Sequence, residues 1–259
     1  LCGAGNNGGD GYLVAANAQR HGMDVRCVAV APTKKLTGDA RKAWQKALAD
    51  GVHVDELETL SEAGLNGLFA GAGIIVDAML GTGVSGAPRE PFAALIRRCN
   101  QAPAPVLAVD LPSGLNATTG AAGGDVVRAT MTVTFIGLKA GLFTGQGAAV
   151  SGEVVFEPLG TADGVAGSGQ QPVAYRRDWA SVMSWLPERP ANAHKGRFGH
   201  VLVVAGDRGY GGAGLLAAEA AARSGAGLVS LATRPEHVTA ALARCPSVMV
   251  HGLIHGSEL

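Results

Sequence analysis

The sequence predicts an α/β protein whose sheet is mostly parallel and is covered by helices on both faces, in three layers. Short apolar stretches alternate along the chain with amphipathic stretches, which is the pattern of strands separated by helices. The apolar stretches are nearly continuous, as expected for parallel strands that are buried on both faces. Glycine is abundant, at 39 of 259 residues, and clusters directly after these stretches, which predicts loops at the strand ends.

Each element is expected from a local pattern. Residues 40–50 have the apolar spacing of an amphipathic helix, and Gly51 follows where a helix commonly stops. Ser61 is expected to cap the next helix. In the first region we predict helices at 13–20, 40–50, 61–70 and 91–100, and strands at 24–31, 73–80, 105–110, 131–136 and 153–156. Later we predict strands at 200–206 and 228–233 and helices at 211–223 and 235–243.

The chain divides into two expected domains. Residues 1–159 form the first domain, and residues 160–189 form a linker and inter-domain segment that begins with the small-residue stretch GTADGVAGSGQQP. Residues 190–259 start a second α/β domain, which is short for an independent unit of this class.

Composition narrows the classes of function. The 21 Lys and Arg residues balance 21 Asp and Glu residues, which gives no electrostatic footprint for nucleic acid or a membrane surface. No apolar run approaches the roughly 20 residues that span a bilayer. The four cysteines lack a CxxC spacing, so we interpret them as reduced thiols of a cytoplasmic protein.

Four apolar stretches run into glycine-rich segments: LCGAGNNGGDG (1–11), VDAMLGTGVSGA (76–87), VDLPSGLNATTG (109–120) and VVAGDRGYGGAG (203–214). Ligands of open parallel sheets bind beyond the carboxyl ends of the strands, so the first three segments should converge on one crevice. The glycines could serve only tight turns. Three such segments in one domain, each with a nearby carboxylate, instead favour a Rossmann-like site for a phosphate-bearing ligand.

The first segment differs from a dinucleotide fingerprint. GAGNNG (3–8) fits G-x-G-x-x-G, but the acidic residue expected at the end of the following strand is absent, which disfavours a conventional dehydrogenase. Asn6, Asn7 and Asp10 carry oxygen atoms that suit an alkali or alkaline-earth cation beside a phosphate. The sequence has no P-loop and no G-x-S-x-G.

Four further polar residues lie near expected strand ends, and each has alternative interpretations. Asp77, within IIVDAML, needs donors, a cation or a proton, and could act as a metal ligand or a general acid/base. Asp110 could bind a ribose hydroxyl or cap its turn, and Ser113 could supply a hydroxyl to a cation. Lys139 is either solvated or able to reach a phosphate or a charged intermediate.

GAGNNGGDG, VDAMLGTGVSG and VDLPSGLNATTG, in this order, resemble the NAD(P)HX epimerase domain. Residues 194–229 are similar to the start of the ADP- or ATP-dependent NAD(P)HX dehydratase domain, which has a ribokinase-like fold. The resemblance covers most of 1–158 and 190–259, and many bacteria fuse the two domains in this order. Compared with the family, the chain is expected to be a fragment truncated at both ends.

The resemblance implies repair of hydrated nicotinamide cofactors. The epimerase, an isomerase, interconverts the R and S forms of NADHX and NADPHX, which carry a hydroxyl on ring carbon 6. The dehydratase, a lyase, removes water from the S form at the expense of ADP or ATP. The expected partner is this small molecule, without nucleic acid or membrane, and the intact protein is expected to be a homo-oligomer.

The resemblance also implies roles for particular residues. A potassium ion would be held by Asn7, Asp77 and Ser113. We assign proton transfer to Asp77, with Lys139 as the second candidate, although a bound cation would keep Asp77 ionised. The alternative is a non-catalytic nucleotide-binding module of the same fold. Substrate contacts are expected at Asn6, Asn7, Gly8, Gly9, Asp10, Gly81, Thr82, Gly83, Val84, Ser85, Gly86, Ala87, Asp110 and Ala213.

Overall fold

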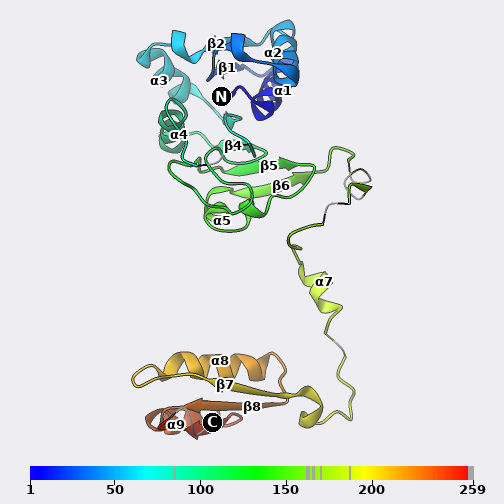
Figure 1. The fold of residues 1–259 in the computed structure, drawn as a ribbon, viewed down its shortest axis with the longest axis vertical. Helices are drawn as coiled ribbons and strands as arrows, with labels where there is room; N and C mark the ends of the chain where they lie inside the picture. Colours follow the sequence, from blue (N-terminus) through cyan, green and yellow to red (C-terminus); the bar gives the residue numbers. More distant parts are fainter. Residues whose placement is uncertain (84–85, 162–163, 165–166, 170, 187, 256–259) are drawn as a thin grey trace. The chain divides into compact units, whose positions relative to one another are not determined.

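The computed structural model describes residues 1–83, 86–161, 164, 167–169, 171–186 and 188–255 (Figure 1). They form two compact units, Leu1–Tyr175 and Arg176–Leu259, whose boundary falls within the segment 160–189 that the sequence assigns to a linker. The named strands pair in parallel in both units, with helices between most of them, which confirms the predicted α/β class.

The first unit is built on two sets of parallel strands that the chain's first residues join. The strands are β1 (Arg26–Ala29), β2 (His53–Glu56), β3 (Ile75–Asp77), β4 (Val106–Val109), β5 (Met131–Phe135) and β6 (Glu153–Glu157), paired as β1-β2 and β3-β4-β5-β6. Cys2 forms parallel bridges to Ala29 on one side and Ala78 on the other. Its backbone N–H donates to Val28 O at 2.9 Å, so residues 1–3 occupy the central position between β1 and β3.

Helices cover both faces of this sheet, which gives the predicted three layers. The helices are α1 (Asn6–Arg20), α2 (Gly38–Ala49), α3 (Glu62–Gly71), α4 (Phe92–Gln101) and the short α5 (Gly147–Val150). Helices α1 and α2 form one apolar cluster with β1, and α3 and α4 form another with β3 and β4. Figure 1 shows the two pairs of helices on different sides of the strands. Ser61 caps α3 as predicted, since its hydroxyl accepts a hydrogen bond from Gly64 N at 3.1 Å.

Helix α1 begins at Asn6 rather than near residue 13, so the expected loop is in fact the first turn of the helix. Glycine has a poor helix propensity, and the glycines here concealed the helical start. Close packing explains their presence: a Cβ on Gly8 would lie 2.0 Å from the Gly3 carbonyl oxygen, and one on Gly11 would lie 2.5 Å from Ala78 Cβ. The glycines therefore let α1 lie directly against the strand ends.

The second unit holds three parallel strands in the order β7-β8-β9. Its elements are α7 (Trp179–Met183), β7 (His200–Val204), α8 (Gly211–Arg223), β8 (Leu228–Thr233), α9 (Val238–Arg244) and β9 (Met249–Gly252). The helix expected at 235–243 is divided into a 3₁₀ turn (Pro235–His237) and α9. The sequence analysis missed β2 and β9. Three of the four residues of β2, HVDE, are polar, so the segment carries little apolar signal.

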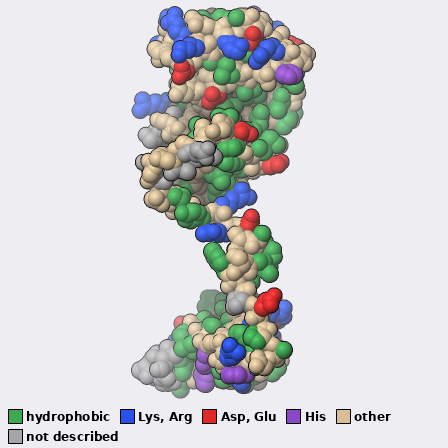
Figure 2. All heavy atoms as spheres, turned by 90° about the vertical axis from the view of Figure 1, so that its right-hand side faces the viewer, with side chains coloured by type: hydrophobic (Ala, Val, Ile, Leu, Met, Phe, Trp, Pro, Cys, Tyr) green, Lys and Arg blue, Asp and Glu red, His purple; other side chains and the backbone are tan. Residues whose placement is uncertain are grey.

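The described surface carries both signs of charge. On the face drawn in Figure 2, acidic and basic side chains lie interspersed over the first unit. Within the described ranges, no helix has the length and apolar character needed to cross a bilayer.

We predict that Gly11→Ala destabilises the first unit by about 1–3 kcal/mol, the usual cost of overpacking a core. The added methyl would lie 2.5 Å from Ala78 Cβ and 2.8 Å from Cys2 Sγ. Gly67→Ala is the matched control, because this helical glycine in α3 has open space around it. Alanine there should stabilise by about 0.5–1 kcal/mol. Urea denaturation measures both variants, and an equal shift for the two would contradict the packing argument.

Candidate functional site

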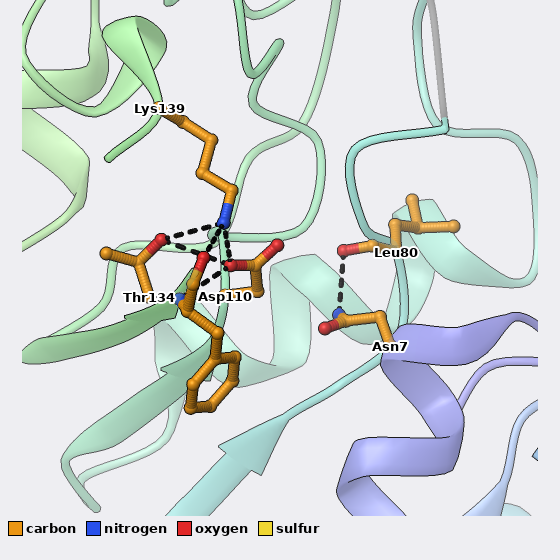
Figure 3. A network of polar contacts seen from close by, with 6 residues as sticks. Asn7, Leu80, Asp110, Thr134 and Lys139 are labelled. Atoms are coloured by element: carbon orange, nitrogen blue, oxygen red, sulfur yellow. Dashed lines mark hydrogen bonds and ion pairs between the residues drawn. The ribbon is translucent and has the colours of Figure 1, made fainter. Parts of the chain in front are cut away.

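The three predicted glycine-rich segments do converge, around a cavity of about 540 Å³ at the carboxyl ends of the strands. Its lining residues are Ala4, Gly5, Asn6, Asn7, Asp10, Met79, Leu80, Gly81, Thr82, Gly83, Phe92 and Asp110. Figure 3 shows Asn7, carried by α1, on one side and Asp110 with Lys139 on the other. The cavity thus has an α1 wall and a wall formed beyond β4 and β5.

The α1 wall contains an open helix N-terminus. Gly5 is the N-cap and supplies no side-chain hydrogen bond, and the backbone N–H of Gly9 is the donor that bonds Gly5 O, at 3.1 Å. The N–H groups of the first turn have no partner within a helix, and the helix dipole makes this end positive. Gly5, Asn6 and Asn7 line the cavity, so this wall suits an anionic group such as a phosphate.

Asp77 lies beneath the cavity and is fully buried. Its Oδ1 accepts hydrogen bonds from Ser113 Oγ at 2.6 Å and Met79 N at 3.2 Å, and its Oδ2 accepts one from Ser113 N at 2.8 Å. Burial raises the pKa of Asp77 above its ordinary value, and these donors act in the opposite direction. Both carboxylate oxygens accept hydrogen bonds and neither reaches the cavity surface, so the contacts favour a structural or ion-binding role for Asp77. Proton transfer by Asp77 stays a prediction.

Asn7 and Ser113 meet at Leu80, next to Asp77. Asn7 Nδ2 donates to Leu80 O at 3.0 Å, and Ser113 Oγ accepts from Leu80 N at 2.9 Å. Asn7 Oδ1 is buried and has no hydrogen-bond partner among the described residues. An unpaired buried oxygen is costly and calls for a partner.

These oxygens fit a monovalent cation. One carboxylate, one hydroxyl and one unpaired amide oxygen are hard ligands that together carry a single negative charge. Across the described ranges, no group of three or more His, Cys, Asp or Glu side chains could hold a metal ion.

Asp110 and Lys139 form a half-buried ion pair on the second wall, with side chains 17% and 18% exposed. Asp110 lies at the end of β4 in the left-handed backbone region, with φ of 65°. Its Oδ1 accepts from Lys139 Nζ, from Thr134 Oγ1 at 3.1 Å and from Phe135 N at 3.1 Å. Lys139 Nζ also donates to Phe135 O at 2.8 Å (Figure 3). Lys139 is thus held at the site and is not a solvated surface lysine.

Asp10 differs from Asp110 in having no hydrogen-bond or ion-pair partner among the described residues. Burial, and then the negative charge of Asp110, raise the pKa of Asp10 above its ordinary value. The two carboxylates therefore influence each other electrostatically, and both line the cavity.

The other expected contacts are spread over several places. Gly8 and Gly9 are buried in α1, against Gly3 and Ala40 respectively, and pack the helix rather than line the cavity. Gly86 lines a neighbouring cavity of about 130 Å³, and Ala87 lies beside Gly123. Val84 and Ser85 lie outside the described residues. Ala213 is exposed in the first turn of α8, in the second unit. Substrate contact by these residues stays a prediction.

Thr134 was missed by the sequence analysis. Its hydroxyl donates to Asp110 and accepts from Lys139 Nζ at 3.1 Å, and the residue is fully buried. A signal was present: in MTVTF the two threonines alternate with larger apolar residues and so share one face of β5. Nothing local reveals that this face turns toward the ion pair.

Comparison with models of known protein families now adds to this geometry. Residues 1–141 match the model described as YjeF-related protein N-terminus. The chain belongs to this family. Residues 201–259 match a second model, described as NAD(P)H-hydrate dehydratase. Together the two matches confirm the resemblance and the domain order read from the motifs, including the ribokinase-like start of the second domain.

Curated relatives of this chain are named bifunctional NAD(P)H-hydrate repair enzymes. The bifunctional NAD(P)H-hydrate repair enzyme Nnr of Escherichia coli K12 is 42% identical over 256 residues, which cover 98% of this chain and 47% of the relative. The Nnr of Coxiella burnetii is 41% identical over 259 residues, covering 100% and 51%. The Leishmania braziliensis enzyme is 42% identical over 257 residues, covering 96% and 45%. The chain spans about half the length of the curated relatives it matches.

A similar fold is found among solved structures. The crystal structure of yeast ynu0 matches with a TM-score of 0.53 and 19% sequence identity, over 68% of this chain and 72% of the yeast chain. This likeness supports the α/β architecture of the family.

We predict that Asp77→Ala lowers the free energy of unfolding by at least about 2 kcal/mol, because it leaves two backbone donors without an acceptor at about 1–3 kcal/mol each. Those donors are Met79 N and Ser113 N, whereas Ser113 Oγ can still donate to Leu80 O at 3.4 Å. Asp39→Ala, at an exposed carboxylate on α2, should leave the urea midpoint unchanged. A midpoint for Asp77→Ala equal to that of the control would show that the loops hold together without the carboxylate.

Proposed function

We propose that the first unit is an NAD(P)H-hydrate epimerase domain and that the second is the start of an ADP- or ATP-dependent NAD(P)H-hydrate dehydratase domain. One observation carries the first assignment: a single cavity presents a helix N-terminus on one wall and Asp110, which is paired with Lys139, on the other. The names of the curated relatives support both assignments.

The cavity can hold a hydrated nicotinamide dinucleotide in one orientation, with the phosphates at one end and the nicotinamide ring at the other. Its volume of about 540 Å³ lies in the usual range for small-molecule sites, about 300–1,000 Å³. The phosphates would lie at the N-terminus of α1 and against the backbone of Gly81–Gly83. The nicotinamide ring would then lie toward Asp110 and Lys139.

Lys139 can begin the reaction as a general acid. In the hydrate, the hydroxylated ring carbon is bonded to the ring nitrogen, whose lone pair expels water once the hydroxyl is protonated. The Lys139 ammonium supplies that proton, and Asp110 holds the ammonium in place. Addition of water to the other face of the ring gives the other epimer.

Asp77 would act with Asn7 and Ser113 as the ligands of a potassium ion. The unpaired Asn7 Oδ1 and the buried carboxylate are the features that fit it. A bound cation would supply charge compensation for Asp77 and fix the segment at Leu80, which these side chains already contact.

For the second unit, we propose Ala213 as a substrate contact of the dehydratase. It lies in the first turn of α8, directly after the glycine-rich segment that follows β7. Backbone N–H groups at such a helix start can bind a phosphate of the substrate.

We predict that the protein converts the R hydrate to the S hydrate and that Lys139→Met slows this conversion at least about 100-fold, the lower range for loss of a general acid. Chromatographic separation of the two epimers measures the rate after subtraction of the spontaneous reaction. Lys42→Met, at an exposed lysine paired with Asp39, should react at the unmodified rate. Binding of the hydrate without conversion by the unmodified protein would favour the non-catalytic module.

We predict that potassium chloride raises the thermal midpoint of the first unit by about 2–4 °C relative to tetramethylammonium chloride at equal ionic strength, as expected for about 1 kcal/mol of binding free energy. Asn7→Ala removes the unpaired oxygen and should abolish this difference. Asn17→Ala, later in the same helix, should retain it. Equal midpoints in the two salts for the unmodified protein would rule out the potassium site.

A further inference from the structure

We propose that Asp10 is a further catalytic residue, which transfers the proton of water on the face of the nicotinamide ring opposite Lys139. This inference rests on the proposed epimerase function. Asp10 belongs to the α1 wall of the cavity, whereas Asp110 belongs to the other wall and is paired there with Lys139.

The order of the strands separates the two walls. Helix α1 follows residues 1–3, which pair with β3 through Ala78, and β3 in turn pairs with β4. The segment after β3 therefore lies between the start of α1 and the end of β4, and it supplies Met79–Gly83 to the middle of the lining. A planar ring bound over this middle segment has Asp10 on one side and the ion pair on the other.

The carboxylates of Asp110 and Asp10 differ in their hydrogen bonding. Asp110 already accepts hydrogen bonds from Lys139, Thr134 and Phe135, so it serves to hold the lysine. Asp10 has no hydrogen-bond or ion-pair partner among the described residues and is free to meet a ligand or water. The field of Asp110 and partial burial both make Asp10 a stronger base than an ordinary carboxylate.

Epimerisation requires proton transfer on both faces. On the first face, Lys139 gives a proton to the hydroxyl, the C–O bond breaks, water leaves, and the nitrogen lone pair forms a C=N bond. On the second face, the oxygen of another water bonds to carbon, the C=N electron pair returns to nitrogen, and the proton lost by that water goes to Asp10. The reverse direction exchanges the two roles. Between turnovers the exposed Asp10 returns its proton to solvent and Lys139 regains one from solvent.

The test follows configuration and oxygen exchange separately. The R hydrate is incubated in ¹⁸O-water, the epimers are separated by chromatography, and the label in each is measured by mass spectrometry. The unmodified protein should give labelled S hydrate. Asp10→Asn should slow R-to-S conversion at least about 100-fold. Label should still enter the R hydrate, because water can leave and return on the Lys139 face.

Two further variants make the outcome decisive. Asp10→Ser introduces a side chain that is small and polar but not basic. It should likewise slow R-to-S conversion while label still enters the R hydrate. Asp39→Asn, an exposed carboxylate on α2, should behave as the unmodified protein. Full conversion by Asp10→Asn, or equal loss of exchange and conversion, overturns the role of Asp10. Absence of both reactions in the unmodified protein instead overturns the proposed epimerase function.

Discussion

A buried carboxylate connects the parts of the cavity. Asp77 ends β3 and binds the backbone and hydroxyl of Ser113, which follows β4. The same hydroxyl accepts from Leu80 N, and the carbonyl of Leu80 holds the side chain of Asn7. One continuous chain of hydrogen bonds thus runs from the loop after β4 to the first turn of α1. Hydrogen bonds of this kind strengthen one another in a low-dielectric interior.

Different contacts position the second wall of the cavity, which is formed beyond β4 and β5. Asp110 is held with a positive φ, which non-glycine residues adopt rarely, so surrounding contacts must maintain it. Those contacts come from β5, through the hydroxyl of Thr134 and the backbone of Phe135. Since β4 and β5 are neighbours, their parallel pairing brings the carboxylate and the lysine together.

The sequence predicted the architecture well because alternation and burial are local patterns. The helix at 211–223 and the Ser61 cap agree with the structure in detail. The start of α1 was wrong because the glycines that permit its packing also erase its helical signal. Convergence of the three segments followed from parallel topology alone. The hydrogen-bond partners of Asp77 and the bridging role of Thr134 could not be predicted from the sequence, because both depend on contacts between residues far apart along the chain.

The glycines of α1 have a mechanical consequence. Gly8 and Gly11 place the helix so near Gly3 and Ala78 that the helix and the central strands must move as one body. The α1 wall therefore cannot swing outward to admit a ligand. Thr82 and Gly83, by contrast, are exposed at the rim of the cavity. The helix is then the fixed side of the cavity and sets the orientation in which a ligand meets its N-terminus.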